Sequence, residues 1–123
     1  MMSEIAFAKV DEKEVKEIMD RLKKLVYEYN KNLKGTQLYL KPYSATYKKN
    51  GKRYYYFGRH WYYLEYKNGK LRWHYLGTYK PVSKLPDPPA IPEVTIVWYQ
   101  GEYYMNPIDL KRIKKFLGME QHE

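Results

Sequence analysis

The sequence of 123 residues contains no cysteine. Disulfides, thiolate zinc sites and cysteine nucleophiles are therefore excluded, and a reducing compartment is expected. No stretch approaches the run of about 20 apolar residues that a membrane helix needs. The start, MMSEIAFAKVDEKEV, lacks the basic and apolar regions of a signal peptide. These absences predict a cytoplasmic protein that does not act on a membrane.

Groups suited to catalysis are also scarce. Residues 41–80 contain one carboxylate, Glu65, and the histidines His60 and His74 are not expected to converge. The sequence has no Gly-rich phosphate loop and no G-x-S-x-G motif. Acid–base or metal catalysis needs at least two convergent groups. We therefore expect no enzymatic activity, no catalytic residue, no metal site and no cofactor.

The positive charge is concentrated in the middle of the chain. The formal net charge is +9, from 23 Lys and Arg against 14 Asp and Glu. Residues 41–80 hold ten Lys and Arg against one acid, which leaves 13 of each sign elsewhere. The same segment holds ten of the 16 tyrosines and two of the three tryptophans. Coinciding charge and aromatic surface are typical of nucleic-acid platforms, and the excess of Lys and Glu is a bias of thermophilic proteins.

The N-terminal part predicts one long helix over residues 11–34. Its apolar residues recur at three- and four-residue spacing, which indicates one buried stripe. Asp11 and Glu14 fit a capping box, and Gly35 fits a left-handed stop. The stripe consists of Val15, Ile18, Met19, Leu22, Leu25, Val26, Tyr29 and Leu33.

The period then changes to two, which predicts a basic aromatic β-meander over residues 37–79. Residues 37–41 fit a short strand, and Pro42 indicates an edge strand or a bend because it lacks a backbone donor. Asn50-Gly51 and Asn68-Gly69 predict two hairpins with two-residue type I′ turns.

The C-terminal third predicts three further pieces. Residues 81–92 hold five of the seven prolines and are expected to form an extended linker. Residues 94–105 fit a pair of strands, and residues 107–117 fit a helix capped by Asn106 and ended by Gly118.

These elements predict a single α+β domain spanning residues 1–123. A long N-terminal helix would pack on a small antiparallel sheet of Asn-Gly hairpins, followed by a Pro-rich crossover, a strand pair and a short helix. The role of residues 1–10 stays open, since residues 5–10 fit either a short strand or an ordered tail.

The second Asn-Gly turn fixes a register that sorts the hairpin into two faces. The apolar face, expected in the core, pairs Tyr66 with Leu71, Leu64 with Trp73, and Tyr62 with Tyr75. The other face, expected in solvent, pairs Lys67 with Lys70, Glu65 with Arg72, Tyr63 with His74, and Trp61 with Leu76. A two-residue first turn would pair Lys49 with Lys52, Lys48 with Arg53, and Tyr47 with Tyr54.

Both hairpin tips thus place like charges opposite each other, which costs some tenths of a kcal/mol per pair. Such pairs suggest an external partner of opposite charge, although edge lysines also prevent aggregation and tyrosine is a good strand former. We expect the cations to hold phosphates of DNA or RNA, with Trp61 and Tyr63 stacking on bases. The candidate residues are Lys48, Lys49, Lys52, Arg53, Arg59, Trp61, Tyr63, Lys67, Lys70, Arg72, His74, Lys111, Arg112, Lys114 and Lys115.

The run GRHWYYLEYKNGKLRWHYLG, residues 58–77, resembles a hairpin that recurs in small proteins of archaea, their viruses and mobile elements. The arm-type DNA-binding sheets of tyrosine integrases look broadly similar. In the archaeal family the hairpin follows a long helix ending in Leu-x-Gly, as residues 33–35 do here. The matching positions are Tyr62, Tyr63, Gly69, Lys70, Tyr75, Leu76 and Gly77.

The resemblance implies a protein of an archaeal virus or mobile element, acting in the host cytoplasm. This chain lacks the cysteines of that family and its Gly-Pro before the aromatic strand, so no metal site is carried over. No integrase catalytic domain is present, so recombination is not carried over either. The same surface also fits an inhibitor of a host defence complex, of the anti-CRISPR type, that engages an acidic protein or ribonucleoprotein.

Overall fold

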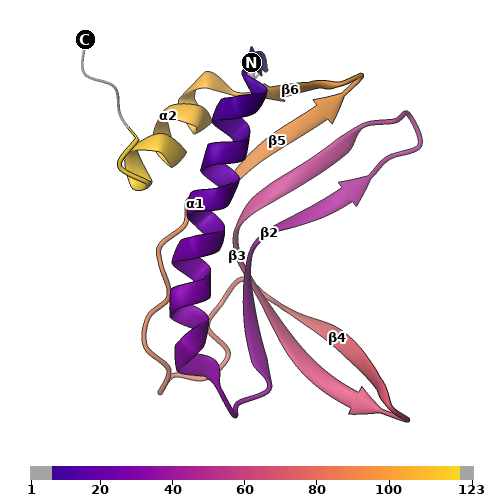
Figure 1. The fold of residues 1–123 in the computed structure, drawn as a ribbon, viewed down its shortest axis with the longest axis vertical. Coiled ribbons are helices and arrows are strands. Elements are labelled where there is room, and N and C mark those ends of the chain that lie inside the picture. Colours follow the sequence, from indigo (N-terminus) through magenta and orange to yellow (C-terminus); the bar gives the residue numbers. More distant parts are fainter. Residues whose placement is uncertain (1–6, 120–123) are drawn as a thin grey trace, which may run out of the picture.

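The computed structural model describes residues 7–119 and has an α+β fold (Figure 1). The helices are α1 (Glu12–Asn30), continued by a 3-10 turn (Lys31–Leu33), and α2 (Pro107–Phe116). The strands are β1 (Ala8–Val10), β2 (Leu38–Tyr47), β3 (Arg53–Lys67), β4 (Lys70–Gly77), β5 (Val94–Tyr99) and β6 (Glu102–Met105). Neither helix of the described residues is long and apolar enough to cross a membrane.

The six strands form one antiparallel sheet in the order β1-β6-β5-β3-β2, and β4 pairs with β3 outside this row. The 15-residue strand β3 pairs with β5 through residues 53–57 and with β4 through residues 61–67. Between these parts the register of β2 and β3 shifts at Lys41 and Tyr43, on either side of Pro42. The expectation that Pro42 marks an edge strand or a bend is therefore confirmed.

The bend divides the sheet into two arms that diverge on one side of α1 (Figure 1). We call β5, β6 and the adjoining residues 43–47 and 53–57 the upper arm. The lower arm consists of β4 with residues 38–41 and 61–67. β3 and β2 run through both arms, so the bend fixes the angle between two surfaces that are otherwise separate.

The predicted helix forms because its apolar stripe has a sheet to cover. Five residues of α1 are buried, together with Leu33 of the following turn, whereas Leu25 remains 37% exposed. The stripe packs in one cluster with Leu40, Phe57, Trp61, Ile96 and Met105 from the sheet. The buried residues of α1 are Val15, Ile18, Leu22, Val26 and Tyr29.

The capping box at the start of α1 is only half formed. The Asp11 carboxylate accepts from the Lys13 backbone N–H at 3.4 Å, as an N-cap does. The Glu14 carboxylate does not reach back to Asp11, because it accepts from the Lys114 ammonium at 3.2 Å instead. Glu14 thereby ties α1 to α2.

The chain ends follow the remaining predictions with one difference, which concerns Ile108. Residues 8–10 form β1, which pairs with β6, so the strand alternative is correct for them; residues 5 and 6 lie outside the described range. α2 begins at Pro107 and is capped by Asn106, which accepts from the Ile108 N–H at 2.8 Å. Ile108, in the first turn of α2, is 69% exposed and does not supply the expected core contact.

The Pro-rich segment crosses from β4 to β5 without helix or strand, as expected. The Tyr29 hydroxyl donates to the Pro86 carbonyl at 2.6 Å, and Ile91 is buried in the core. These contacts hold the crossover against the body of the protein.

The register of the second hairpin is confirmed for six pairs, from Lys67 with Lys70 to Tyr62 with Tyr75. Asn68 and Gly69 have φ angles of 53° and 76°, as a type I′ turn requires. The seventh pair is wrong, because an irregularity after Tyr62 places Trp61 opposite Gly77 and not Leu76.

The register of the first hairpin is wrong by one residue. Tyr47 lies opposite Arg53, and the Lys48 N–H donates to the Lys52 carbonyl at 2.8 Å. Only Gly51 has a positive φ, of 85°, so the turn spans three residues with the glycine in the left-handed position. Arg53 consequently shares a face with Tyr47.

Candidate nucleic-acid interface

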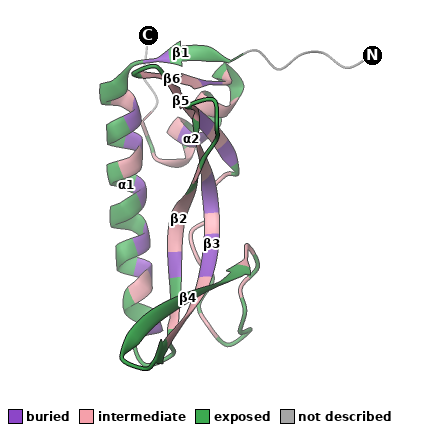
Figure 2. Cartoon of the chain, turned by 90° about the vertical axis from the view of Figure 1, so that its right-hand side faces the viewer, coloured by how far each residue is buried: buried purple, intermediate pink, exposed green. Residues whose placement is uncertain are grey.

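The apolar face of the lower arm is exposed, which corrects the expectation that it enters the core. Tyr66 is 75% exposed, Tyr75 54%, Trp73 43% and Leu71 40%. The reason is which face of the sheet α1 covers, since α1 packs over the alternate residues Leu40 and Trp61, which are buried. Figure 2 shows β4 exposed along its length. Alternation of residue types identified the face correctly but assigned it the wrong environment.

The exposed rings of this face contact one another across three strands. Tyr39 of β2 lies opposite Tyr62 of β3, and Tyr62 lies opposite Tyr75 of β4. Trp73 meets Tyr39 and Tyr62 edge to face, with centroid distances of 5.3 and 5.6 Å. We call Tyr39, Tyr62, Tyr66, Trp73 and Tyr75 the aromatic platform. Mutual ring contacts hold Tyr39, Tyr62, Trp73 and Tyr75 in a defined arrangement without covering them.

One cation lies on the platform. The Lys41 ammonium lies 4.2 Å from the ring centroid of Trp73 and 5.1 Å from that of Tyr62. Among the ion pairs formed by residues 7–119, none includes Lys41. The ring faces stabilise its charge without neutralising it.

The opposite face of the lower arm carries polar groups. The expected pairing of Glu65 with Arg72 holds in register, but the Glu65 carboxylate contacts His74 at 3.1 Å, diagonally across the strands. Tyr63 is half-buried, and its hydroxyl donates to Gln37 at 3.4 Å. Arg72 is exposed and, within the described part of the chain, forms no ion pair. The tip residues Lys67 and Lys70 are exposed and face each other.

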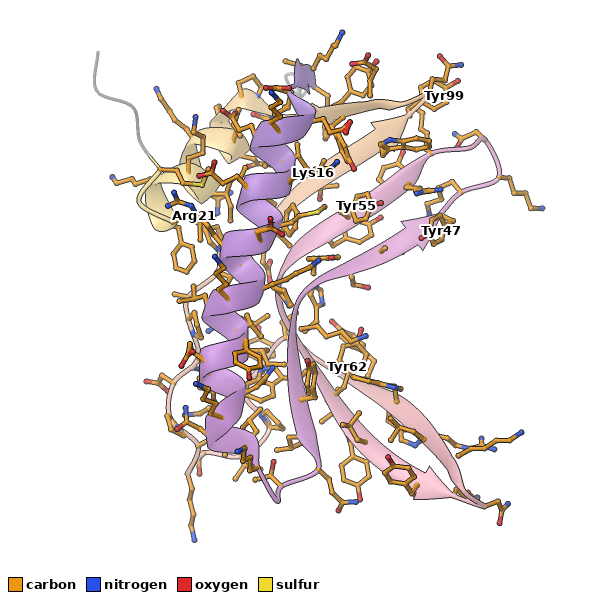
Figure 3. The ribbon with its side chains drawn as sticks, in the orientation of Figure 1. Lys16, Arg21, Tyr47, Tyr55, Tyr62 and Tyr99 are labelled. Carbon is orange, nitrogen blue, oxygen red and sulfur yellow. The ribbon has the colours of Figure 1, made fainter. Side chains whose placement is uncertain are left out.

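The tip of the upper arm carries cations on aromatic rings. The Arg53 guanidinium lies 5.1 Å from the ring centroid of Tyr47 and 4.6 Å from that of Trp98. Lys48 lies over Tyr54 at 5.7 Å, and Lys52 lies over Tyr99 at 5.3 Å. Tyr47 and Tyr99 can be followed at the ends of their strands in Figure 3. Lys49 is exposed at the turn.

Trp61 cannot stack on a ligand, because it is fully buried. Its ring meets Tyr29 edge to face at 6.0 Å beneath α1. The sequence suggested a surface position because Trp61 alternates with Tyr62. In the structure it lies opposite Leu40, where the helix does cover the sheet.

Arg59 lies away from the tips, half-buried at the bend. It faces the Pro-rich crossover, where the hydrogen bond and charge of Lys80, with a smaller contribution from Arg59, lower the pKa of Asp87. The Lys80 ammonium contacts that carboxylate at 2.8 Å. These two cations therefore serve the crossover and not the arms.

The basic residues of α2 are not brought to the arms. α2 lies on the other side of α1 (Figure 1). Two of its cations form ion pairs with carboxylates of the protein. Arg112 contacts Asp109 of the same helix at 3.0 Å, and Lys114 contacts Glu14 of α1 at 3.2 Å. Lys111 and Lys115 are exposed. The predicted backbone contacts from this helix would have to reach around the protein.

A groove of about 920 Å³ lies where the arms diverge, between α1, the bend of β2 and the aromatic platform. Figure 3 shows Tyr62 in the angle between the arms. We call this groove the fork groove. Its lining includes Lys23, Lys24, Tyr39, Lys41, Tyr62 and Trp73. None of these six was a candidate from the sequence, because helical periodicity placed the first two on a solvated face and strand alternation placed the last two in the core.

His60 joins the two arms at the bend. Its Nε2 donates to the Tyr56 carbonyl at 2.9 Å, which leaves Nδ1 to accept from the Tyr75 hydroxyl at 3.1 Å. Burial lowers the pKa of His60, and burial raises the pKa of Tyr75. The imidazole of His60 therefore links β3 of the upper arm to the platform.

Within residues 7–119, no group of three or more His, Asp or Glu side chains is placed to hold a metal ion. No protein-family model, curated protein or solved structure matches this chain. The resemblance to archaeal and viral hairpins accordingly stays a prediction, and function is argued from the site alone.

Proposed function

We infer that this protein binds nucleic acid through its two arms and catalyses no reaction. The observation that carries the proposal is the aromatic platform, which is largely exposed and bordered by cations that have no carboxylate partner among residues 7–119. Phosphates are the groups that such cations complement, and base faces are what exposed rings stack on.

The charge distribution supports a polyanionic partner. Of the ten Lys and Arg in residues 41–80, only Lys80 forms an ion pair within the described part of the chain. The other 83 residues carry 13 Lys and Arg against 13 Asp and Glu, and six of these cations form ion pairs, for example Lys9 with Glu102 and Arg21 with Glu17. The protein therefore neutralises its charge in the body and leaves it unneutralised on the arms.

The aromatic surface supports the same partner. A ring face left in water loses the stabilisation that burial would give, by about 25 cal/mol per Å² of apolar surface. Trp73 and Tyr75 are about half exposed although a core lies one strand away. Contiguous exposed apolar surface of this kind usually marks a binding site.

The test compares two pairs of exposed lysines by fluorescence anisotropy with a labelled oligonucleotide of random sequence. Lys67→Ala with Lys70→Ala removes the lower tip, and Lys111→Ala with Lys115→Ala removes an equal charge from α2. The tip variant should reduce the slope of log K against log salt by about 1.4 to 1.8, the value for two lost phosphate contacts. The α2 variant should keep the wild-type slope.

An equal reduction of the salt slope in both variants would show that the oligonucleotide is attracted by net charge alone. That result would overturn the assignment of binding to the arms. A protein partner is tested in parallel by capture from a lysate with and without nuclease. Capture of one protein that survives nuclease, together with no oligonucleotide binding, would assign the arms to a protein and contradict the proposal.

A further inference from the structure

The fork groove combines features that the tips of the arms lack. It is a concave site where the aromatic platform forms one wall and α1 forms the other. Its cations come from both walls, Lys23 and Lys24 from α1 and Lys41 from β2. The following argument rests on the proposed function and asks which form of nucleic acid this site fits.

The groove is complementary to an anion. Lys41 is half-buried, and its ammonium is held over two rings with no carboxylate within ion-pair distance among residues 7–119. The acid in the groove lining, Glu28, is already engaged by Lys31 at 3.0 Å. Lys23 lies over Tyr43 at 5.9 Å. Three cations thus face the groove without a competing free carboxylate.

The platform offers ring faces, and only unstacked bases can use them. In a duplex, neighbouring base pairs cover both faces of each base, so a protein reaches edges and backbone. In a single strand the bases can separate and stack on aromatic side chains. Trp73 and Tyr75 present half of their surface to solvent on adjacent positions of one face of β4. This surface suits base faces better than base edges.

The size of the groove points the same way. A volume of about 920 Å³ lies within the range of sites that hold one small ligand. It therefore takes one or two nucleotides and not the cross-section of a duplex. The platform continues from the groove through Trp73 to Tyr66 near the tip, along which further nucleotides can lie.

We propose that the ligand is single-stranded nucleic acid, with bases on the aromatic platform and phosphates against Lys23, Lys24 and Lys41 in the fork groove. The tip lysines then hold the backbone beyond the groove. α1, which has no part in binding by the arms alone, becomes one side of the site.

Fluorescence anisotropy tests the proposal with labelled oligothymidine and oligouridine of about 15 nucleotides, near the upper site size of single-strand-binding domains. A DNA duplex of the same length is the comparison. The single strands should bind at least about tenfold tighter. Trp73→Ala should weaken single-strand binding by about 5- to 150-fold, the effect of one lost stacking contact. It should leave duplex binding unchanged.

Two variants control for folding and for charge. Tyr79→Ala removes a ring that is 86% exposed and lies outside the platform, so it should bind as the wild type does. Lys23→Ala with Lys24→Ala changes only the helix side of the groove. It should lower the salt slope for single strands by about 1.4.

Equal affinity for duplex and single strand, with no effect of Trp73→Ala or of the helix variant, would overturn the single-strand assignment. In that case the tip variant Lys67→Ala with Lys70→Ala would still weaken binding if the proposed function is correct. Absence of salt-dependent binding to all three probes would overturn both the single-strand assignment and the proposed function.

Discussion

The ammonium of Lys41 lies 4.2 Å from the ring centroid of Trp73, two strands away across the lower arm. The contact joins β2 to β4 over β3 and so helps to hold the rings of the aromatic platform in place. It also keeps a positive charge beside an exposed ring, which is the combination that a nucleotide meets with its phosphate and base.

Replacing Lys41 tests how much its contact with Trp73 contributes to the stability of the protein. Lys41→Gln should lower the free energy of unfolding by about 0.5 to 1 kcal/mol, because a partly exposed cation–π contact is lost. Urea denaturation measures the change. Lys34→Gln, at an exposed lysine without an aromatic contact, should shift stability by less than that. Equal shifts in the two variants would mean that the contact with Trp73 contributes nothing.

The lower tip should show opposite effects on stability and binding. Lys67 and Lys70 lie directly opposite each other, so Lys70→Glu exchanges a repulsive pair for an attractive one. The free energy of unfolding should rise by about 0.2 to 1 kcal/mol, while oligonucleotide affinity should fall. Lys70→Gln should lie between the wild type and Lys70→Glu in both measurements. A more stable variant with unchanged affinity would remove the tip from the interface.

Trp61 should matter for stability and not for binding. Trp61→Ala should cost about 3 to 5 kcal/mol through the cavity left beneath α1. Trp61→Phe should cost much less, because it also removes the indole N–H, which is buried without a partner. Denaturation and anisotropy on the same samples check this. A folded Trp61→Phe protein that no longer binds would place Trp61 in the site after all.

Much of the fold was predictable because local patterns determine it. The stripe of α1 from Val15 to Tyr29, the cap at Asn106 and the turn at Asn68 depend on neighbours in the sequence. The register of the first hairpin could not be predicted in this way, although its turn has the same sequence as the second, Lys-Asn-Gly-Lys. Asn50 keeps a negative φ there, and β3, which leaves this turn, also pairs with β5.

The site was harder to predict for a different reason. Alternation shows which residues share a face of a strand, but it does not show which of the two faces the helix covers. α1 packs on the face with Leu40 and Trp61, so the alternate face with Tyr39 and Tyr62 stays outside the core. The platform was therefore predicted as core and Trp61 as surface. Lys23 and Lys24 gave no signal, because only the bend of β2 places them opposite the rings.

The junction at His60 predicts a dependence of stability on pH. Burial lowers its pKa, while the Tyr56 carbonyl and the Glu93 carboxylate oppose that shift. A group with a lowered folded pKa contributes stability above its unfolded value, about 6.5 for histidine, and loses it as the pH falls through the folded value. The wild type should therefore lose stability as the pH falls below about 6.5.

His60→Gln provides the comparison, because the amide can still donate to the Tyr56 carbonyl but does not titrate. Its stability at pH 8 measures the cost of losing the ring. From there toward pH 5 its stability should fall less than that of the wild type, as measured by urea midpoints. Parallel curves for the two proteins would show that His60 does not titrate in this range.

The salt dependence of oligonucleotide binding tests the central claim most directly. Seven cations of the arms lack a carboxylate partner in the described chain, namely Lys48, Lys49, Lys52, Arg53, Lys67, Lys70 and Arg72. If each neutralises one phosphate, these seven contacts should contribute about −5 to the slope of log K against log salt for single strands and about −6 for a duplex, and Lys23, Lys24 and Lys41 should steepen the single-strand slope by about a further 2. An affinity that stays constant between low and moderate salt would contradict nucleic-acid binding by the arms.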